Sequence, residues 1–321
     1  MERNVITKVR VCEIPVKQNY CLRYRIEDPV LQDSIQKYGL ITPVLMVRDE
    51  EGIQVLSGHR RLNALRRLGE ESIDGIAVDP KWTKKDLFYI ALLSNWNQSW
   101  TDLDRAFCLG RAAHEFGISK DESLSKVLPL LGIPGEIKFY ETALKSMTLE
   151  ACVLDRVAEQ KVPYRVIRYM HPWTKEDQIL FSSEIAGKIH LSLGEFRNLV
   201  QWMGEISREA KSPLGDWLRE INTDSFLESE DLDCVHKGDR LYLSVRRKRF
   251  PNLTEQEREF QKVAGDIHRD LREISLEPPQ SFEETGYVLK ARVQDRNALD
   301  KVLKELITKK NKLNSLFDVL L

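Results

Sequence analysis

The chain has 321 residues, with 49 lysines and arginines against 50 aspartates and glutamates, so its formal net charge is −1. Its 42% hydrophobic and 31% charged residues are typical of a globular protein, and its length predicts two or three domains. No stretch approaches the roughly 18 apolar residues of a membrane span, and the N-terminus has no signal-peptide core. The five cysteines are odd in number and contain no C-x-x-C pair, which is typical of reduced thiols and not of a disulfide framework or zinc site. We therefore expect a cytoplasmic protein without a membrane partner. Because the overall charge is balanced, any nucleic-acid binding must come from a local patch.

Residues 1–100 alternate strand-like and helix-like segments, which predicts a small α/β domain. The expected strands cover 9–16, 42–49, 52–58 and 74–80, and the expected helices cover 28–40, 59–69 and 84–97. Pro29 near the start of its helix and Gly39 and Gly69 at two helix ends are standard boundary signals.

Residues 101–207 read as a series of helices with short connections, and residues 208–321 form a third region. Start signals in the helical region include Thr101 and the pair Ser192 and Glu195, which predicts a capping box. In the third region we expect a helix from about Thr254, strands at 274–278 and 287–293, and a terminal helix that packs on the second strand. The expected fold class is α+β, with an α/β domain at 1–100, an all-α domain at 101–207 and a small α/β domain at 208–321.

The string VLSGHRRLNALRRLG contains the most informative pattern. A strand ends at Leu56, Gly58 lets the backbone approach a ligand closely, and a helix begins with Arg60 and Arg61 in its first turn. Unpaired N–H groups and the helix dipole at such a start favour an anion, and guanidinium groups strengthen phosphate binding. The alternative is a plain turn, with the two arginines solvated or paired with Glu70 and Glu71.

The segment from Leu31 to Val78 resembles the N-terminal domain of the ParB family, which shares a fold with sulfiredoxin. The matching residues, in order and at the family spacing, are Ser34, Ile35, Gly39, Leu40, Pro43, Gly58, Arg60, Arg61 and Ala64. A later family box resembles SNWNQSWTDLDRA, with Asn95 and Ala106 retained. The resemblance continues through a helix-turn-helix middle domain and covers about 9–205.

This resemblance implies a bacterial protein that binds CTP with Mg²⁺ and acts as a nucleotide-gated clamp on DNA. By position, Gly58, Arg60 and Arg61 would hold the triphosphate and Asn95 the metal ion. Either Arg23 or Arg25 would be the arginine of the first family box. His59, beside Gly58, is a further contact or, as the alternative, a helix cap or surface residue.

The sequence departs from the family pattern at three positions. His59 and Ser94 stand where the family has glutamates, and Gln98 stands where it has an arginine. Carboxylates commonly hold magnesium or orient water in phosphoryl transfer. We therefore expect nucleotide binding with at most weak CTPase activity. Sulfiredoxin chemistry is excluded, because it needs a cysteine where this chain has His59.

Two sets of residues are candidates for DNA contact. The stretch 140–149 resembles the family's recognition helix and, with the residues just before it, offers Lys138, Thr142 and Lys145, although Glu136 and Glu141 would repel phosphate. The alternative is a helical packing domain that no longer recognises DNA. The second set is the basic cluster Arg246, Arg247, Lys248 and Arg249, which would contact phosphates without sequence readout. Its alternative is a solvated face balanced by the acidic stretch 228–233.

The leading hypothesis is a ParB-like protein of plasmid or chromosome partition, or of a related regulatory task. By analogy its partners include DNA, a partner ATPase and a second copy of the chain. One alternative is a protein–protein adaptor on a degenerate ParB scaffold. Another is a nuclease or phosphotransferase of the same fold.

Overall fold

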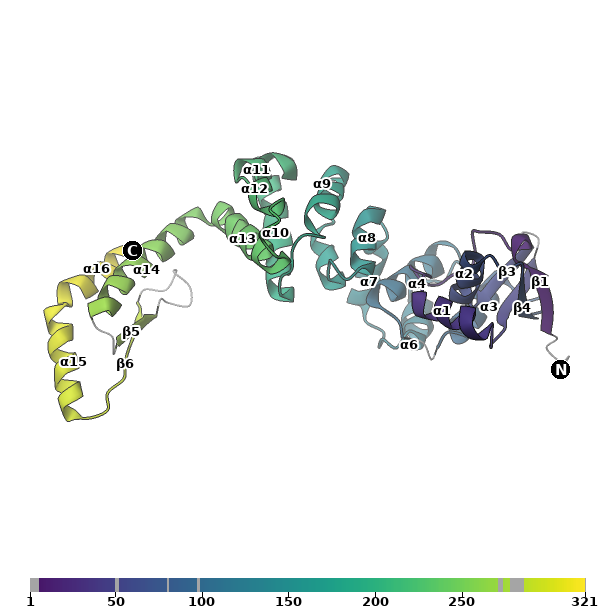
Figure 1. Ribbon diagram of the computed structural model, residues 1–321, viewed down its shortest axis with the longest axis horizontal. Coiled ribbons are helices and arrows are strands. Elements are labelled where there is room, and N and C mark those ends of the chain that lie inside the picture. The colour runs from purple at the N-terminus through teal and green to yellow at the C-terminus, as the bar shows by residue number, and fades with distance from the viewer. Residues whose placement is uncertain are drawn as a thin grey trace. The chain divides into compact units, whose positions relative to one another are not determined.

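A computed structural model describes residues 6–49, 52–79, 81–96, 99–270, 274–277 and 286–320 of the chain (Figure 1). The chain divides into two compact units, Met1–Ile189 and His190–Leu321. None of the helices described is both long and apolar enough to cross a membrane. The division into three domains predicted from the sequence stays a prediction.

The first unit begins with a four-stranded sheet in the order β1-β4-β2-β3. Its strands are β1 (Ile6–Arg10), β2 (Val44–Asp49), β3 (Gly52–Ser57) and β4 (Ser72–Ala77). The pairs β1–β4 and β2–β3 are antiparallel, whereas β2 and β4 are parallel. The helices of this region are α1 (Pro29–Tyr38), α2 (His59–Leu68) and α3 (Lys84–Leu93). The first expected strand is partly wrong, because Val11–Glu13 forms a 3₁₀ turn.

Local signals place the ends of α1 and α2. The Asp28 carboxylate accepts a hydrogen bond from the Leu31 amide, and Pro29 occupies the first turn of α1, where it removes no helical hydrogen bond. The helix α2 begins after Gly58 and ends before Gly69, which have φ of +108° and +73°. Both values lie in the left-handed region that favours glycine.

Seven helical stretches follow within the first unit. They are α4 (Asp102–His114), the continuous run α5, η2 and α6 (Lys120–Leu130), α7 (Ile137–Ser146), α8 (Ala151–Ala158), the 3₁₀ segment η3 (Tyr164–Tyr169), α9 (Lys175–Leu180) and the π-helical turn η4 (Phe181–Ile185). Thr101 caps α4 through a full capping box with Asp104. The predicted recognition helix was misplaced: α7 begins three residues before Tyr140 and ends at Ser146.

Two hydrophobic cores hold the first unit together. One packs α1 and α2 on the sheet, through residues such as Ile35, Val55 and Leu65. The other joins residues on both sides of position 100, among them Leu56 and Phe88 from the sheet region. The α/β region therefore packs directly on α4 and α7, and Trp100 belongs to this shared core.

The second unit consists of helices and one small sheet. Its elements are α10 (Leu193–Ala210), α11 (Leu214–Glu220), α12 (Asp224–Leu227), α13 (Cys234–Arg249), α14 (Pro251–Asp270), β5 (Ile274–Glu277), β6 (Val288–Ala291), α15 (Arg296–Thr308) and α16 (Lys310–Leu320). The predicted capping box of Ser192 and Glu195 is confirmed at the start of α10. The single terminal helix predicted from the sequence is wrong, because the chain leaves helical geometry at Lys309.

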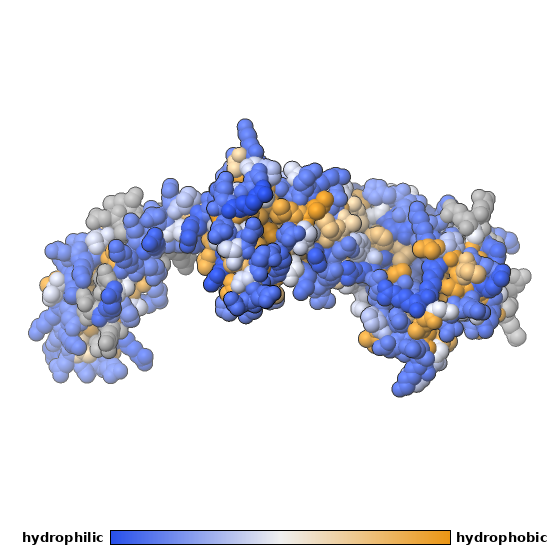
Figure 2. All heavy atoms as spheres, turned by 45° about the horizontal axis from the view of Figure 1, so that its top comes forward, coloured by the Kyte–Doolittle hydropathy of each residue, from blue (hydrophilic) through white to orange (hydrophobic). Residues whose placement is uncertain are grey.

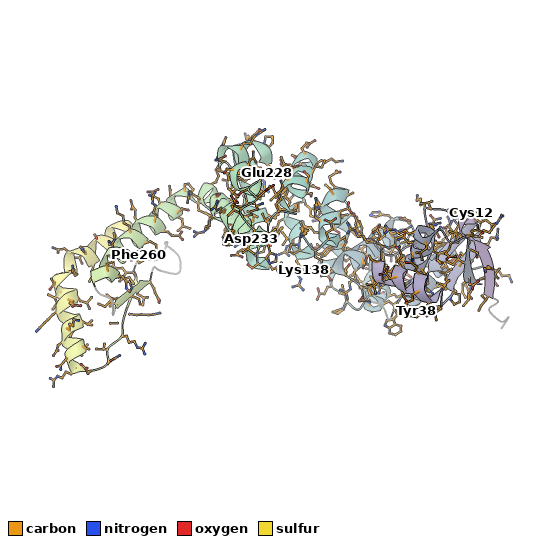
Figure 3. All side chains as sticks on the ribbon, in the orientation of Figure 1. Cys12, Tyr38, Lys138, Glu228, Asp233 and Phe260 are labelled. Carbon is orange, nitrogen blue, oxygen red and sulfur yellow. The ribbon has the colours of Figure 1, made fainter. Side chains whose placement is uncertain are left out.

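A separate core lies within the second unit, where α14, β5 and α15 bury Phe260, Ile274 and Val302. Phe260 is labelled in Figure 3. Terminal-helix residues Leu306 and Leu313 pack on this core as expected, whereas Leu303 and Ile307 are 49% and 75% exposed. The expectation of a buried terminal helix therefore holds for one face of α15. The face of the molecule in Figure 2 is mainly hydrophilic, with apolar areas interrupting it in places.

Candidate anion-binding pocket

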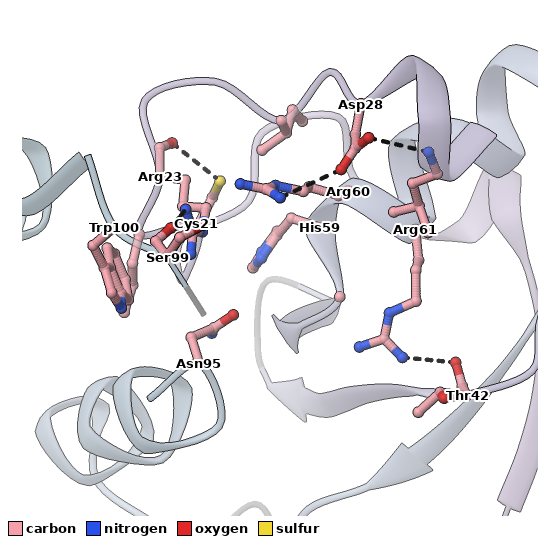
Figure 4. Close-up of a pocket in the computed structure, with 14 residues that line it drawn as sticks. Cys21, Arg23, Asp28, Thr42, His59, Arg60, Arg61, Asn95, Ser99 and Trp100 are labelled. Carbon is pink, nitrogen blue, oxygen red and sulfur yellow. Dashed lines mark hydrogen bonds and ion pairs between the residues drawn. The ribbon is translucent and has the colours of Figure 1, made fainter. Parts of the chain in front are cut away.

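A cavity of about 500 Å³ lies beside the start of α2 (Figure 4). Its walls come from the loop before α1, the start of α2, and Asn95, Ser99 and Trp100. Most of the residues predicted from the sequence line it: Arg23, Gly58, His59, Arg60, Arg61 and Asn95. A cavity of this size is in the range of small-molecule sites in proteins.

Gly58 shapes the inner wall of the pocket. Its φ of +108° disfavours any side chain, and a Cβ there would lie 2.6 Å from Cγ1 of Val44. The main chain can therefore turn sharply from β3 into α2 and expose the first amides of the helix. Such amides attract anions.

Arg60 and Arg61 are held by different partners. Arg60 donates to Oδ2 of Asp28 at 3.3 Å, whereas Nη1 of Arg61 donates to the carbonyls of Thr42 at 2.6 Å and Pro43 at 2.8 Å. The alternative expectation, that these arginines pair with Glu70 and Glu71, is therefore wrong. Among the residues described, Arg61 forms no ion pair, so its charge is not balanced by a neighbouring carboxylate.

Of the two candidate arginines before α1, Arg23 lines the pocket and Arg25 does not. Arg23 is 7% exposed, forms an ion pair with Asp104 and stacks over the Trp100 ring at 4.5 Å. Burial lowers the pKa of Arg23, and the Asp104 charge opposes that shift. Arg25 instead pairs with Glu159, just after α8.

His59 is an uncharged group in the pocket wall. Burial, followed by the positive charge of Arg111, lowers its pKa to about 3, so the imidazole is neutral at physiological pH. Its buried Nε2 has no hydrogen-bond partner among the described residues, and the same holds for Nε1 of Trp100, which is 8% exposed. Unpaired buried polar atoms are costly, and these two offer an acceptor and a donor to a ligand.

The donor set does not fit the Mg²⁺ that the family resemblance implies. Asn95 uses its amide nitrogen on the Ala91 carbonyl, which leaves its oxygen, and Ser94 donates to the Ile90 carbonyl. Gln98 lies outside the described residues. No group of three or more histidine, cysteine or acidic side chains with metal-binding geometry occurs in the described part of the chain. Mg²⁺ is usually held through one or two carboxylates, so Asn95 alone is a poor site for it.

Several pocket residues were missed by the sequence analysis. Asp28, Cys21, Thr42 and Trp100 all line the cavity. Burial raises the pKa of the Cys21 thiol, which disfavours the reactive thiolate. The only available signal was Asp28 directly before Pro29, which indicates a helix cap and says nothing about a partner in α2.

The DNA candidates of the first unit lie on α7. Lys138, labelled in Figure 3, and Lys145 are exposed, and Thr142 is half-buried. Glu141 lies on the same exposed face and pairs with Lys120. The face therefore carries mixed charge.

The basic cluster of the second unit forms the last turn of α13 and is largely paired. Arg246 makes two hydrogen bonds of 2.6 Å to Glu257 in α14, and Lys248 pairs with Glu220. Arg249 pairs with Glu205 and Glu209 of α10. Arg247 is exposed and forms no ion pair within the described chain. These partners lie outside the acidic stretch 228–233 from which balancing charge was expected.

No protein-family model matches the chain. A curated relative, the chromosome-partitioning protein ParB of Myxococcus xanthus (strain DK1622), is 24% identical over 119 residues, or 34% of this chain. The match spans 40% of that protein's length.

Two solved structures are similar, both of the C-terminally truncated ParB from Caulobacter crescentus, each covered to 98% and 13% identical. The one complexed with CTP-γ-S covers 56% of this chain with a TM-score of 0.27. The one complexed to the centromeric parS site covers 61% with a TM-score of 0.34.

Proposed function

We propose that the chain is a divergent relative of the ParB family and a DNA-associating partition protein whose pocket binds a nucleoside triphosphate, CTP by resemblance. The observation that carries the nucleotide part is the meeting of the α2 N-terminus, Arg60 and Arg61 at one cavity. The helix amides and the guanidinium groups there favour phosphate oxygens. The unpartnered Nε1 of Trp100 and Nε2 of His59 offer hydrogen bonds to the rest of the ligand.

The proposal includes binding without efficient hydrolysis. Hydrolysis requires a group that orients or activates the attacking water. The carboxylates near the pocket are engaged elsewhere: Asp28 accepts from Arg60, and Asp104 accepts from Arg23. His59 is half-buried, and its imidazole is neutral. The nucleotide then acts as a regulatory ligand and is not a substrate with rapid turnover.

Calorimetric titration of the full chain with CTP tests the proposal. We expect saturable binding that is at least about tenfold weaker in Arg61→Ala, because a charge-assisted hydrogen bond contributes roughly 1.5–3 kcal/mol. Arg67→Ala is the matched control, because Arg67 lies on the same helix, is exposed and pairs with Glu27. Thermal unfolding of both variants checks that the loss is not one of folding. Equal affinity in all three proteins, or no CTP binding, contradicts the proposal.

We propose DNA association through exposed lysines on α7, with a homodimer and a partner ATPase as further partners by resemblance. The exposed face of α15 offers apolar surface for a second copy, since Leu299, Leu303 and Ile307 recur every four residues along it.

A second candidate function, a protein–protein adaptor, is favoured by one observation. Arg246, Lys248 and Arg249 are neutralised by glutamates, which leaves little free charge on α13 for DNA. Fluorescence anisotropy with a labelled duplex distinguishes the two functions. An absence of binding at both about 0.05 M and about 0.15 M salt favours the adaptor, because phosphate contacts weaken as salt rises and would still be detected at the lower concentration.

A further inference from the structure

The acidic groups of the pocket are already used by the protein itself. Asp28 is the one carboxylate among the described residues that line the cavity. Its Oδ1 accepts from the Leu31 amide at 3.0 Å and its Oδ2 accepts from Arg60 at 3.3 Å. Asp104 lies behind the wall, where it holds Arg23 and the Tyr24 amide. Among the residues that the structure describes, no uncommitted carboxylate at the cavity is left for a bound cation.

The positive groups, in contrast, exceed the acids. Arg23 pairs with Asp104 and Arg60 pairs with Asp28, whereas Arg61 is held by two carbonyl oxygens and forms no ion pair with the residues described. The first amides of α2 add the positive end of a helix of ten residues. A polyanion can therefore be neutralised by the protein itself. A divalent cation would face both the excess arginine charge and a shortage of hard oxygen ligands.

Figure 4 shows Asp28 directed at Arg60 at the edge of the cavity. An anionic ligand that reaches Arg60 must share this guanidinium with Asp28 or displace it. Asp28 is 28% exposed and Arg60 34% exposed, so the pair is partly hydrated and exchange with another anion is feasible.

We propose that the pocket binds its triphosphate as the metal-free anion, with Arg60 and Arg61 in place of a metal ion and with Asp28 as an internal competitor for Arg60. This inference rests on the proposed nucleotide function. It departs from the magnesium-dependent binding that the family resemblance implies, and it assigns Asp28 a role opposite to that of a metal ligand.

The substitution Asp28→Asn separates these two roles by the sign of its effect. Asparagine caps a helix about as well as aspartate, so α1 keeps its start. If Asp28 competes with the ligand, its neutral replacement strengthens binding. If Asp28 held a cation for the ligand, the same replacement would weaken binding. Glu27→Gln is the matched control, because Glu27 is the adjacent acid, is 49% exposed and pairs with Arg67 outside the cavity.

The experiment is calorimetric titration of the full chain with CTP and, separately, with inorganic tripolyphosphate, each in excess EDTA and in excess Mg²⁺. We expect the dissociation constant in EDTA to lie within about twofold of that in Mg²⁺. We expect Asp28→Asn to bind roughly fivefold more tightly, since the competing ion pair is partly exposed. Glu27→Gln should bind like the unchanged protein.

Tenfold or greater loss of binding in EDTA overturns the inference, and so does weaker binding by Asp28→Asn. Rescue by Mn²⁺ or Zn²⁺ after EDTA treatment also overturns it, because it would make the His59 imidazole a ligand for a nitrogen-tolerant cation. Tripolyphosphate binding in EDTA without CTP binding supports the metal-free anion site and contradicts the CTP proposal. Binding of neither probe contradicts both.

Discussion

Gly58 is the residue on which the geometry of the pocket depends most directly. Substituting alanine there introduces strain at φ +108° and places Cβ 2.6 Å from Cγ1 of Val44, a core residue that is fully buried. We expect Gly58→Ala to lower the free energy of unfolding by about 2–4 kcal/mol, as strain and overpacking add. Chemical denaturation measures the loss.

Gly69→Ala provides the matched control at the other end of α2. Gly69 has φ +73°, and its Cβ would meet nothing within 4 Å. This variant should lose only about 1 kcal/mol from backbone strain. If both variants lost the same free energy of unfolding, the close approach to Val44 would not contribute to the cost of Gly58→Ala.

His59 couples the stability of this region to pH. Its pKa is about 3 in the folded chain, below the usual value of about 6.5 in the unfolded chain. As pH falls below about 6.5, His59 is protonated in the unfolded chain but stays neutral in the folded chain. The free energy of unfolding therefore decreases. Between pH 7 and 5 we expect a loss of about 1–2 kcal/mol from this group.

Denaturation of the unchanged protein and His59→Gln across this range tests the coupling. Glutamine removes the titrating group, so the pH dependence of the variant should be shallower by the same amount. Burial also lowers the pKa of His171, whose contribution is common to both proteins. Parallel profiles for the two proteins would count against a lowered pKa of His59 in the folded chain.

At the scale of single residues, the sequence could predict what local geometry decides. Gly58, Arg60 and Arg61 were found because a strand, a glycine and a helix start occur within a few positions. Asp28 and Trp100 were missed because their partners are distant in sequence. Asp28 pairs with Arg60, which follows it by 32 residues, and Trp100 packs against Arg23, which precedes it by 77 residues. Propensity and spacing carry no information about such pairings.

At the scale of elements, the last turn of α13 mainly connects α13 to neighbouring helices, and this leaves less of its charge for DNA. The two hydrogen bonds between Arg246 and Glu257 tie α13 to α14, and both side chains are less than one-third exposed. We expect Arg246→Gln to lower the free energy of unfolding by about 1 kcal/mol, in the range for a bidentate, partly buried pair. Arg247→Gln should leave stability unchanged within about 0.5 kcal/mol, because Arg247 is exposed.

The two variants also separate stability from DNA binding. A change in DNA affinity for Arg247→Gln without a change in the unfolding midpoint would assign phosphate contact to this turn. If Arg246→Gln proved as stable as the unchanged protein, the junction would not depend on the pair.

Element boundaries were predicted where a cap or a glycine marks them, as for α1, α2 and α10. The break at Lys309 was not, because the apolar spacing runs on through 303–313 and no glycine or proline interrupts it. The partners of the basic cluster were also not foreseeable. The nearest acidic stretch in sequence was the natural choice, whereas helix packing brings Glu205, Glu220 and Glu257 to the cluster instead.

At the scale of the whole molecule, the net charge of −1 limits how the chain can hold DNA. Without an excess of positive charge, binding must rest on a few local phosphate contacts, and each contact contributes about −0.9 to the slope of log affinity against log salt. Lys138 and Lys145 are the exposed lysines on α7 proposed here for this role. The double variant Lys138→Gln, Lys145→Gln should therefore reduce the magnitude of that slope by about 2. A double variant at Lys81 and Lys175, which are 89% and 78% exposed and paired with Asp79 and Glu150, removes the same charge elsewhere and serves as the control. Fluorescence anisotropy at several salt concentrations gives both slopes. If the two double variants shift the slope equally, the attraction is a property of total charge and α7 is not the contact surface.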